Sequence, residues 1–294
     1  MPRYLVYGLI VESEWELPDL EPAAGAPSAR IGSGEHEGTL SANPGPPRWW
    51  AEGNRVFLTD PLVGIICISG GSEVSVHLSE CPDRPLLQAY LLGPALAALL
   101  HQRGFLVLHA SVLARHSRAL AILGNSGDGK STLALQLCSG GWRLVADDQA
   151  VIEWTERGPA VHSGRGALRV SWEVLSHFGE TSAIGTTNEC RDKLLFRPGT
   201  PFSEQTPLSC LYVLGQAEQI RCTRIPPQDA FAQLVQHSFM GSLLTSSDSL
   251  ALHFLQCADL AERLPVRRLE RPQSLAMLAR LAKVINDDFE KLVH

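Results

Sequence analysis

The sequence lacks the features that would place it in an oxidising compartment or a membrane. Its seven cysteines are scattered and no two form a C-x-x-C pair, so neither a disulfide framework nor a zinc or redox motif is supported. No apolar run approaches the roughly 20 residues that cross a bilayer. Glu12, Glu14 and Glu16 follow the N-terminus too closely for a secretory signal. We therefore expect a cytoplasmic protein with no membrane partner.

The sequence also has fewer basic than acidic residues, 25 Lys and Arg against 31 Asp and Glu. The formal net charge is −6 over 294 residues. Nucleic-acid binding needs clustered positive charge to neutralise phosphates, so we expect no nucleic-acid partner. What the chain does have is 45% hydrophobic residues, enough to build a sizeable core.

Residues 1–82 are predicted to form a small β-rich N-terminal domain, and residues 83–294 a second, nucleotide-binding domain. The strand candidates of the first domain are Tyr4–Ile10, Val56–Leu58 and Val63–Ser69. Between them, Glu21–Pro47 is rich in Pro, Gly, Ala and Ser and is predicted to be a loop. Pro85–Gln102 has a helical pattern that Gly93-Pro94 interrupts.

The second domain contains a strand, a glycine loop, a helix and a strand in that order. Ala119–Leu123 is a buried strand candidate, Thr132–Cys138 a helix that ends at Gly140-Gly141, and Arg143–Ala146 another strand. A phosphate-binding loop requires this order. The remaining candidates are strands at Phe105–Leu113, Leu208–Leu214 and Val266–Leu269, and helices at Asp229–His237, Ser249–Arg263 and from about Pro272.

The loop between strand and helix, Gly124–Ser131, fits G-x-x-x-x-G-K-[ST]. Glycines let the backbone curl so that successive N–H groups point at phosphates, and the helix N-terminus adds its positive dipole end. Lys130 supplies a charge for the β- and γ-phosphates, and the Ser131 hydroxyl can ligate Mg²⁺. We therefore expect ATP and Mg²⁺ as cofactors. The loop residues expected to bind them are Gly124, Asn125, Ser126, Gly127, Asp128, Gly129, Lys130, Ser131 and Thr132.

Two aspartates, Asp147 and Asp148, end the strand that follows the loop helix. Strand ends gather at the edge of the phosphate loop in such folds. One aspartate can therefore hold Mg²⁺ while the other accepts the proton of an incoming hydroxyl. The alternative is that one caps a turn and the other alone binds metal. His109 lies on the preceding strand, where a histidine by itself is more often a satisfied core residue.

The run from His109-Ala-Ser-Val, through the loop, to Leu-Val-Ala-Asp-Asp148 resembles the HPr kinase family over about residues 105–150. These are serine kinases related in fold to PEP carboxykinase. The resemblance implies a mixed α/β (α+β) PEP carboxykinase/HPr-kinase-like P-loop domain preceded by a small β-rich N-terminal domain. It also implies that Asp147 is the general base, that Asp148 and Ser131 hold Mg²⁺, that Lys130 binds the transferring phosphate, and that His109 positions or tunes the acidic pair.

The chain departs from the family after the acidic pair. The signature Glu-Ile-Arg-Gly-Leu-Gly of bifunctional HPr kinase/phosphorylases is absent, so neither the phosphorolytic reverse reaction nor HPr as substrate is implied. Four basic residues are candidates for stabilising transition-state charge. Two of them, Arg165 and Arg169, lie where the signature would stand, and the other two, Lys193 and Arg197, follow later in the chain. The alternative for each is a solvated surface charge. The remaining arginines expected at the surface are Arg267, Arg268 and Arg271.

The favoured function is transfer of the ATP γ-phosphate to a serine hydroxyl of a peptide or small protein. The N-terminal opening and the tail are similar to HPr-kinase-like proteins encoded with ribosomal peptide clusters. Some of those resemble enzymes that phosphorylate the C-terminal serine of lasso-peptide precursors. Two alternatives stay open: a kinase for a small-molecule or glycan hydroxyl, and a non-catalytic nucleotide-responsive regulatory module. The β-rich domain could dock an acceptor peptide by strand addition, and a homo-oligomer is compatible with the sequence.

Overall fold

The computed structural model describes residues 1–35, 46–180, 185–186, 193–199, 205–241, 244 and 247–293. The chain divides into two compact units. The first comprises Met1–Val107 with Phe239–His253, and the second comprises Leu108–Ser238 with Phe254–His294. The division differs from the expected break after residue 82, because the helices that follow residue 83 pack with the N-terminal strands. No helix in the described ranges is both long and apolar enough to cross a membrane.

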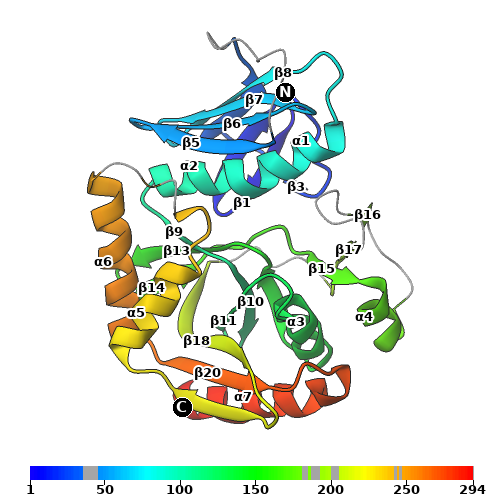
Figure 1. Cartoon of the computed structure of the whole chain (residues 1–294), viewed down its shortest axis with the longest axis vertical. Helices are drawn as coiled ribbons and strands as arrows, with labels where there is room; N and C mark the ends of the chain where they lie inside the picture. The colour runs from blue at the N-terminus through cyan, green and yellow to red at the C-terminus, as the bar shows by residue number, and fades with distance from the viewer. Residues whose placement is uncertain are drawn as a thin grey trace. The chain divides into compact units, whose positions relative to one another are not determined.

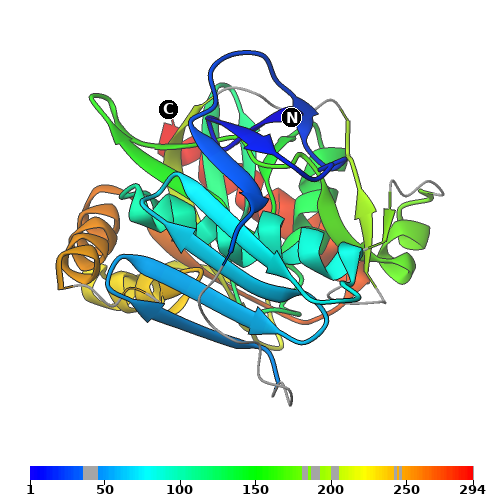
Figure 2. The ribbon, with the colours of Figure 1, turned by 90° about the horizontal axis from the view of Figure 1, so that it is seen from above.

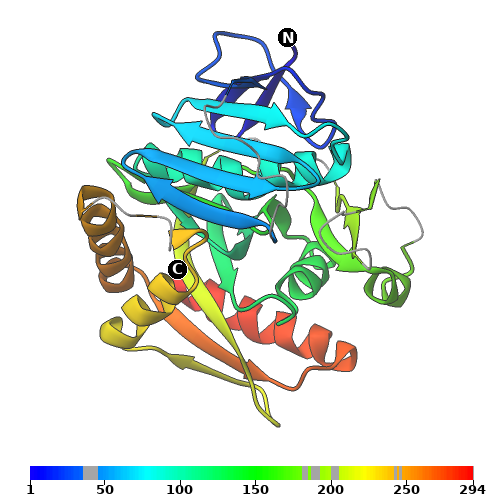
Figure 3. The ribbon, with the colours of Figure 1, turned by 45° about the horizontal axis from the view of Figure 1, so that its top comes forward.

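A mixed sheet forms the first unit, with the described strands in the order β3-β1-β2-β4-β8-β7-β6-β5. The strands are β1 (Arg3–Val6), β2 (Leu9–Ser13), β3 (Glu21–Pro22), β4 (Ala29–Ser33), β5 (Arg48–Glu52), β6 (Arg55–Asp60), β7 (Gly64–Ser69) and β8 (Glu73–Leu78). β4 is parallel to both of its neighbours, whereas β5 to β8 form an antiparallel meander, visible side by side in Figure 3. The unit is β-rich, as the sequence predicted.

Two details of the first unit differ from the sequence prediction. The single strand expected at Tyr4–Ile10 is a hairpin, because Tyr7 and Gly8 both have positive φ (49° and 75°) and reverse the chain between β1 and β2. Such a two-residue turn matches the twist of the paired strands. The expected loop at Glu21–Pro47 contains strands β3 and β4, and its residues 36–45 lie outside the described ranges.

Helices α1 (Arg84–Tyr90), η1 (Leu91–Ala95) and α2 (Leu96–Gln102) follow the sheet and lie against one of its faces in Figures 1 and 2. The Asp83 carboxylate caps α1 by accepting a hydrogen bond from the N–H of Leu86. Gly93 leaves helical geometry (φ −98°, ψ −108°) directly before Pro94. The predicted interruption of the helix at Gly93-Pro94 is confirmed.

The second unit is built on a sheet whose described order includes β12-β10-β11-β18-β14-β13, with β20 and β19 continuing from β18. Its strands are β10 (Ala110–Arg115), β11 (Arg118–Leu123), β12 (Arg143–Ala146), β13 (Ala150–Thr155), β14 (Gly158–Val161), β18 (Thr206–Gln216), β19 (Arg221–Arg224) and β20 (Val266–Arg271). Its helices are α3 (Lys130–Ser139), α4 (Trp172–His177), α5 (Pro227–Gln236), η3 (Leu275–Met277) and α7 (Leu278–Val293). Two elements have residues in both units: β9 (Leu106–Leu108) and α6 (Ser247–Arg263). A small separate sheet contains β15 (Leu168–Ser171), β17 (Lys193–Phe196) and β16 (Gly185–Thr186).

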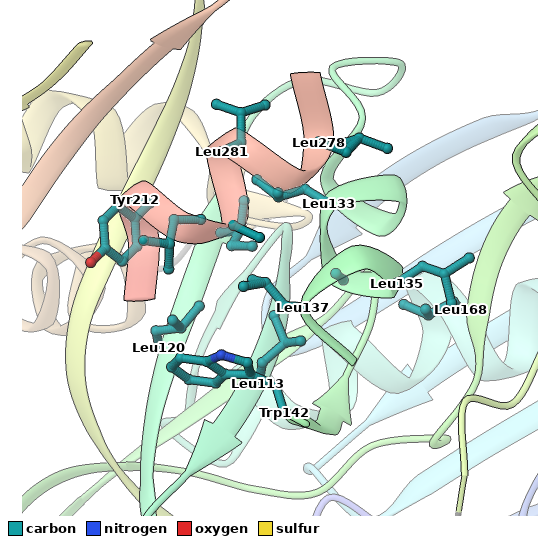
Figure 4. Packing of buried hydrophobic residues seen from close by; sticks show 14 of the residues in the cluster. Leu113, Leu120, Leu133, Leu135, Leu137, Trp142, Leu168, Tyr212, Leu278 and Leu281 are labelled. Carbon is teal, nitrogen blue, oxygen red and sulfur yellow. The ribbon is translucent and has the colours of Figure 1, made fainter. Parts of the chain in front are cut away.

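The core of the second unit lies between this sheet and helices α3 and α7. Leu133 and Leu137 of α3 lie close to Leu281 of α7, and Trp142 closes the cluster, as Figure 4 shows. Trp142 packs edge-on against Phe289 with ring centroids 4.8 Å apart. Its indole N–H donates to the side chain of Asn286. This packing holds α3, and with it the loop before α3, against the sheet.

The strand register brings the site residues to one edge. β11 and β12 are both antiparallel to β10, with Leu123 opposite Ala110 and Ala146 opposite Val112. The residues just before β10, just after β11 and just after β12 therefore meet at one end of the three strands. Those residues are His109, the glycine loop and the acidic pair. The mixed α/β fold with a P-loop unit is as predicted from the sequence.

Candidate active site

The glycine loop connects the end of β11 to the N-terminus of α3 (Figure 1). Gly127 and Gly129 have φ of +90° and +82°, a geometry that suits glycine, and no side chain caps the N-terminus of α3. In the described part of the chain, the N–H groups of Ser126, Gly127 and Gly129 have no hydrogen-bond acceptor. Unpaired N–H groups at a helix N-terminus are a natural anion site.

Lys130, the first residue of α3, turns its side chain back over the loop. It is only 6% exposed, and its ammonium donates to the carbonyl oxygens of Gly124 (2.9 Å) and Asn125 (3.0 Å). Its third contact is Nε2 of His109 at 2.9 Å. Burial lowers the pKa of Lys130, and the negative charges of the acidic pair oppose that shift.

Asp147 is buried, with 6% of its surface exposed, and accepts hydrogen bonds from two serine hydroxyls and one backbone N–H. The Ser111 hydroxyl donates to Oδ1 at 2.5 Å, and the Ser131 hydroxyl lies 3.1 Å and 2.9 Å from Oδ1 and Oδ2. The backbone N–H of Arg169 donates to Oδ2 at 3.0 Å. The carboxylate is therefore held in one orientation beside the hydroxyl of the P-loop serine.

Asp148 has different partners. Its carboxylate pairs with the Arg169 guanidinium and lies 3.3 Å from Nδ1 of His109. Burial would raise the pKa of Asp148, but the charges of Arg169 and Arg165, with the hydrogen bond from Arg169, hold it below its usual value. Its backbone has φ of +74°, a left-handed conformation that Asp tolerates in turns. The two aspartates thus share one cluster but lie in different environments.

His109 lies at a bend between β9 and β10, where the sequence predicted one continuous strand. Its Nδ1 lies 3.0 Å from the backbone oxygen of Asp148. An ammonium can only donate, so Nε2 accepts from Lys130 and the ring proton is on Nδ1, directed at Asp148. Burial, together with the Lys130 charge, lowers the pKa of His109 and favours this neutral form.

The other predicted cations lie around the same cluster. The charge of Arg165 acts on Asp148, and that of Lys193 acts on Lys130. Arg169 and Lys193 come from the paired strands β15 and β17, where Ser171 is opposite Lys193. Within the described residues, no group of three or more His, Cys, Asp and Glu side chains is arranged to enclose a metal ion.

No family model matches the chain. The HPr kinase/phosphorylase of Prosthecochloris aestuarii is 35% identical over 80 residues, or 27% of this chain and 22% of that protein. The HPr kinase/phosphorylase of Xylella fastidiosa is 38% identical over 117 residues, or 40% of this chain and 34% of that protein. Over these segments the chain is similar to HPr kinase/phosphorylases.

The chain spans only 22% and 34% of the length of these two relatives. A solved structure, the Hpr(Ser) kinase/phosphatase of Coxiella burnetii, aligns over 64% of this chain and 99% of that chain with 14% identity. Its TM-score of 0.33 is too low for that alignment to support the site.

Two residues at the candidate site were not foreseen from the sequence. Ser111 is fully buried and donates to Asp147; it lies two residues after His109, a spacing that places alternate strand residues on one face. Arg271, predicted to be a surface charge, is 5% exposed and donates to the loop oxygen of Asp128. The surface prediction also fails for Arg267, which pairs with Asp288 and is half-buried.

Proposed function

We propose that the protein is an ATP- and Mg²⁺-dependent kinase that transfers the γ-phosphate to a serine hydroxyl of a peptide or small protein. The observation that supports this best is the pairing of Ser131 with Asp147 at the mouth of an open phosphate loop. Nucleotide binding alone requires the loop. Phosphoryl transfer also requires a metal ligand and a group that receives the hydroxyl proton, and Ser131 and the two aspartates are our candidates for these roles.

The residues fit Mg²⁺ and a polyphosphate. Ser131 directs its proton at Asp147, which leaves its oxygen lone pairs for a hard cation. The N–H groups of the loop and the Lys130 ammonium suit phosphate oxygens. When bound, Mg²⁺ would neutralise charge on the transferring phosphate.

For the proton acceptor we propose Asp147. The hydroxyls of Ser111 and Ser131 and the backbone N–H of Arg169 hold its carboxylate in place, so its orientation is set before a substrate arrives. Asp148 is less suited, because the Arg169 guanidinium already engages it. We propose Asp148 for the metal together with Ser131. That role requires its carboxylate to turn from Arg169 towards the cation.

We propose that the surrounding cations balance the charge of the reacting phosphate. Lys130 would contact it directly, while Arg165, Arg169 and Lys193 would contribute positive potential around Asp148. His109 would position Lys130 and Asp148 relative to each other, because one ring nitrogen binds Lys130 and the other binds Asp148.

For the acceptor we propose a serine-containing peptide, and a lasso-peptide precursor with a C-terminal serine is the first one to test. The N-terminal residues 1–82 are proposed as its docking region. In the first unit β5 is the terminal strand of the described sheet, and strand addition to such an edge is a common mode of peptide binding.

The test is intact-mass analysis of serine peptides incubated with protein and Mg·ATP. We expect a gain of one phosphate, and we expect Asp147→Asn to lose turnover by several orders of magnitude. Asp287→Asn, at an exposed site on α7, is the matched control and should retain full activity. If wild-type protein binds Mg·ATP but phosphorylates a small metabolite or glycan instead, the peptide assignment is wrong. If it binds Mg·ATP and phosphorylates nothing, the kinase proposal is wrong.

The roles of the two aspartates separate in binding experiments. We expect Asp147→Asn to keep Mg²⁺-dependent ATP affinity and Asp148→Asn to lose it, measured by calorimetry with and without Mg²⁺. The opposite pattern would assign Asp147 to the metal and overturn its role as proton acceptor.

A further inference from the structure

Arg271 lies against the phosphate loop from within the fold. It is the last residue of β20 and is 5% exposed. Its guanidinium donates to the carbonyl oxygen of Gly215, at 2.8 Å near the end of β18, and to that of Asp128 in the loop. One side chain therefore connects the central sheet to the phosphate loop.

The charge of Arg271 is unusual for a buried residue. Within the described part of the chain, no carboxylate lies within ion-pair distance of its guanidinium, and its hydrogen bonds go to carbonyl oxygens. Burial lowers the pKa of Arg271, yet a guanidinium stays protonated at neutral pH. The charge of Asp128 acts on the guanidinium without forming an ion pair, and a buried cation that lacks a full ion pair is costly. The guanidinium contacts the loop that is the candidate anion site.

The contact with Asp128 also determines where the loop N–H groups point. In a trans peptide the C=O and the following N–H point in opposite directions. With the Asp128 oxygen directed at Arg271, the N–H of Gly129 is directed away from it, to the open side of the loop. Gly129 lies directly beside the guanidinium, since a Cβ built there would be 3.6 Å from Nη2.

We propose that Arg271 is a positioning residue for polyphosphate binding: it holds the Asp128–Gly129 peptide so that the Gly129 N–H faces the phosphates, and its buried charge is balanced by them. The inference rests on the proposed nucleotide site and is independent of the acceptor. It predicts that the contribution of Arg271 grows with the number of phosphates on the ligand.

The experiment measures the affinity of the full-length protein for ATP, ADP, AMP and pyrophosphate, each with Mg²⁺, by titration calorimetry. We expect Arg271→Gln to weaken ATP and pyrophosphate binding by about 10- to 150-fold, the effect of losing hydrogen bonds from a charged group. AMP binding should change less than threefold. Arg271→Lys keeps the charge but cannot donate to two oxygens at once. We therefore expect it to lose less affinity than Arg271→Gln for each ligand, with ATP and pyrophosphate again affected more than AMP.

Arg267→Gln is the matched control, because Arg267 lies on the same strand and is half-buried but pairs with Asp288 instead of the loop. We expect it to lower the urea midpoint and leave pyrophosphate affinity unchanged. If Arg271→Gln and Arg271→Lys both bind pyrophosphate as wild type does, the proposal is overturned and Arg271 only supports the fold. If wild-type protein binds neither Mg·ATP nor pyrophosphate, the nucleotide site itself is wrong. That result would be distinct from a kinase that binds ATP but rejects the chosen peptide.

Discussion

Replacing Ser111 by alanine tests whether the carboxylate of Asp147 must be held in place for phosphoryl transfer. Ser111 is 0% exposed and its hydroxyl donates to Oδ1 of Asp147 at 2.5 Å. Without it, the Ser131 hydroxyl at 3.1 Å is the donor left on Oδ1 among the hydrogen bonds of the described residues. A hydrogen bond to a charged group contributes about 1.5–3 kcal/mol. If that loss falls on the transition state, kcat decreases by about 10- to 150-fold, since 1.36 kcal/mol corresponds to about tenfold.

The assay is steady-state phosphorylation of the peptide identified by mass analysis, at saturating Mg·ATP. We expect kcat to fall while the KM for ATP stays within about twofold, because Ser111 donates to Asp147 and not to the phosphate loop. Ser139→Ala is the control; its hydroxyl donates to the backbone oxygen of Leu135 at the end of α3. A urea titration of each variant checks that the assayed protein is folded. A Ser111→Ala kcat within twofold of wild type would refute the reasoning.

Three further predictions concern binding and stability. Lys130→Met removes the ammonium from the loop, so calorimetry should show ATP binding weakened by about tenfold or more. Phe289→Ala empties the space beside Trp142 and should lower the free energy of unfolding by about 3–5 kcal/mol in urea, with Phe289→Leu losing less. Burial lowers the pKa of His101 to about 4, below the roughly 6.5 of an unfolded chain, so stability present above pH 6.5 is lost as pH falls towards 4. Between pH 7 and pH 5 this effect removes about 2 kcal/mol, which His101→Gln should lack in paired urea titrations.

Much of the P-loop unit could be predicted from the sequence. The strand at Ala119–Leu123 and the helix at Thr132–Cys138 lie within β11 and α3, and the strand at Arg143–Ala146 matches β12. These elements depend on short-range features: apolar runs of strand length, good helix formers, and glycines where the backbone needs positive φ. That the acidic pair lies near the phosphate loop followed from the rule that strand ends gather at the loop edge. The resemblance grouped Ser131 with Asp148, whereas the hydroxyl of Ser131 donates to Asp147.

The sequence prediction failed where one residue's environment depends on a distant segment. His109 was expected within a strand, but its contacts with Asp148 and Lys130 hold it at a bend. The compact units divide after Val107. Whether residues 1–82 act as a separate docking region stays a prediction. The roles of the individual site residues likewise stay predictions until the variants are measured.

The sequence by itself determined the phosphate loop, its strand and helix, and the kinds of side chain available for phosphoryl transfer, because these depend on neighbours within a few residues. Only the tertiary structure decided which aspartate pairs with the P-loop serine, which one the arginine engages, and that Arg271 lies buried against the loop. The partners of these contacts are 16, 21 and 143 residues apart in the chain. No local pattern records such pairs, because strand register and the packing of the sheet bring them together.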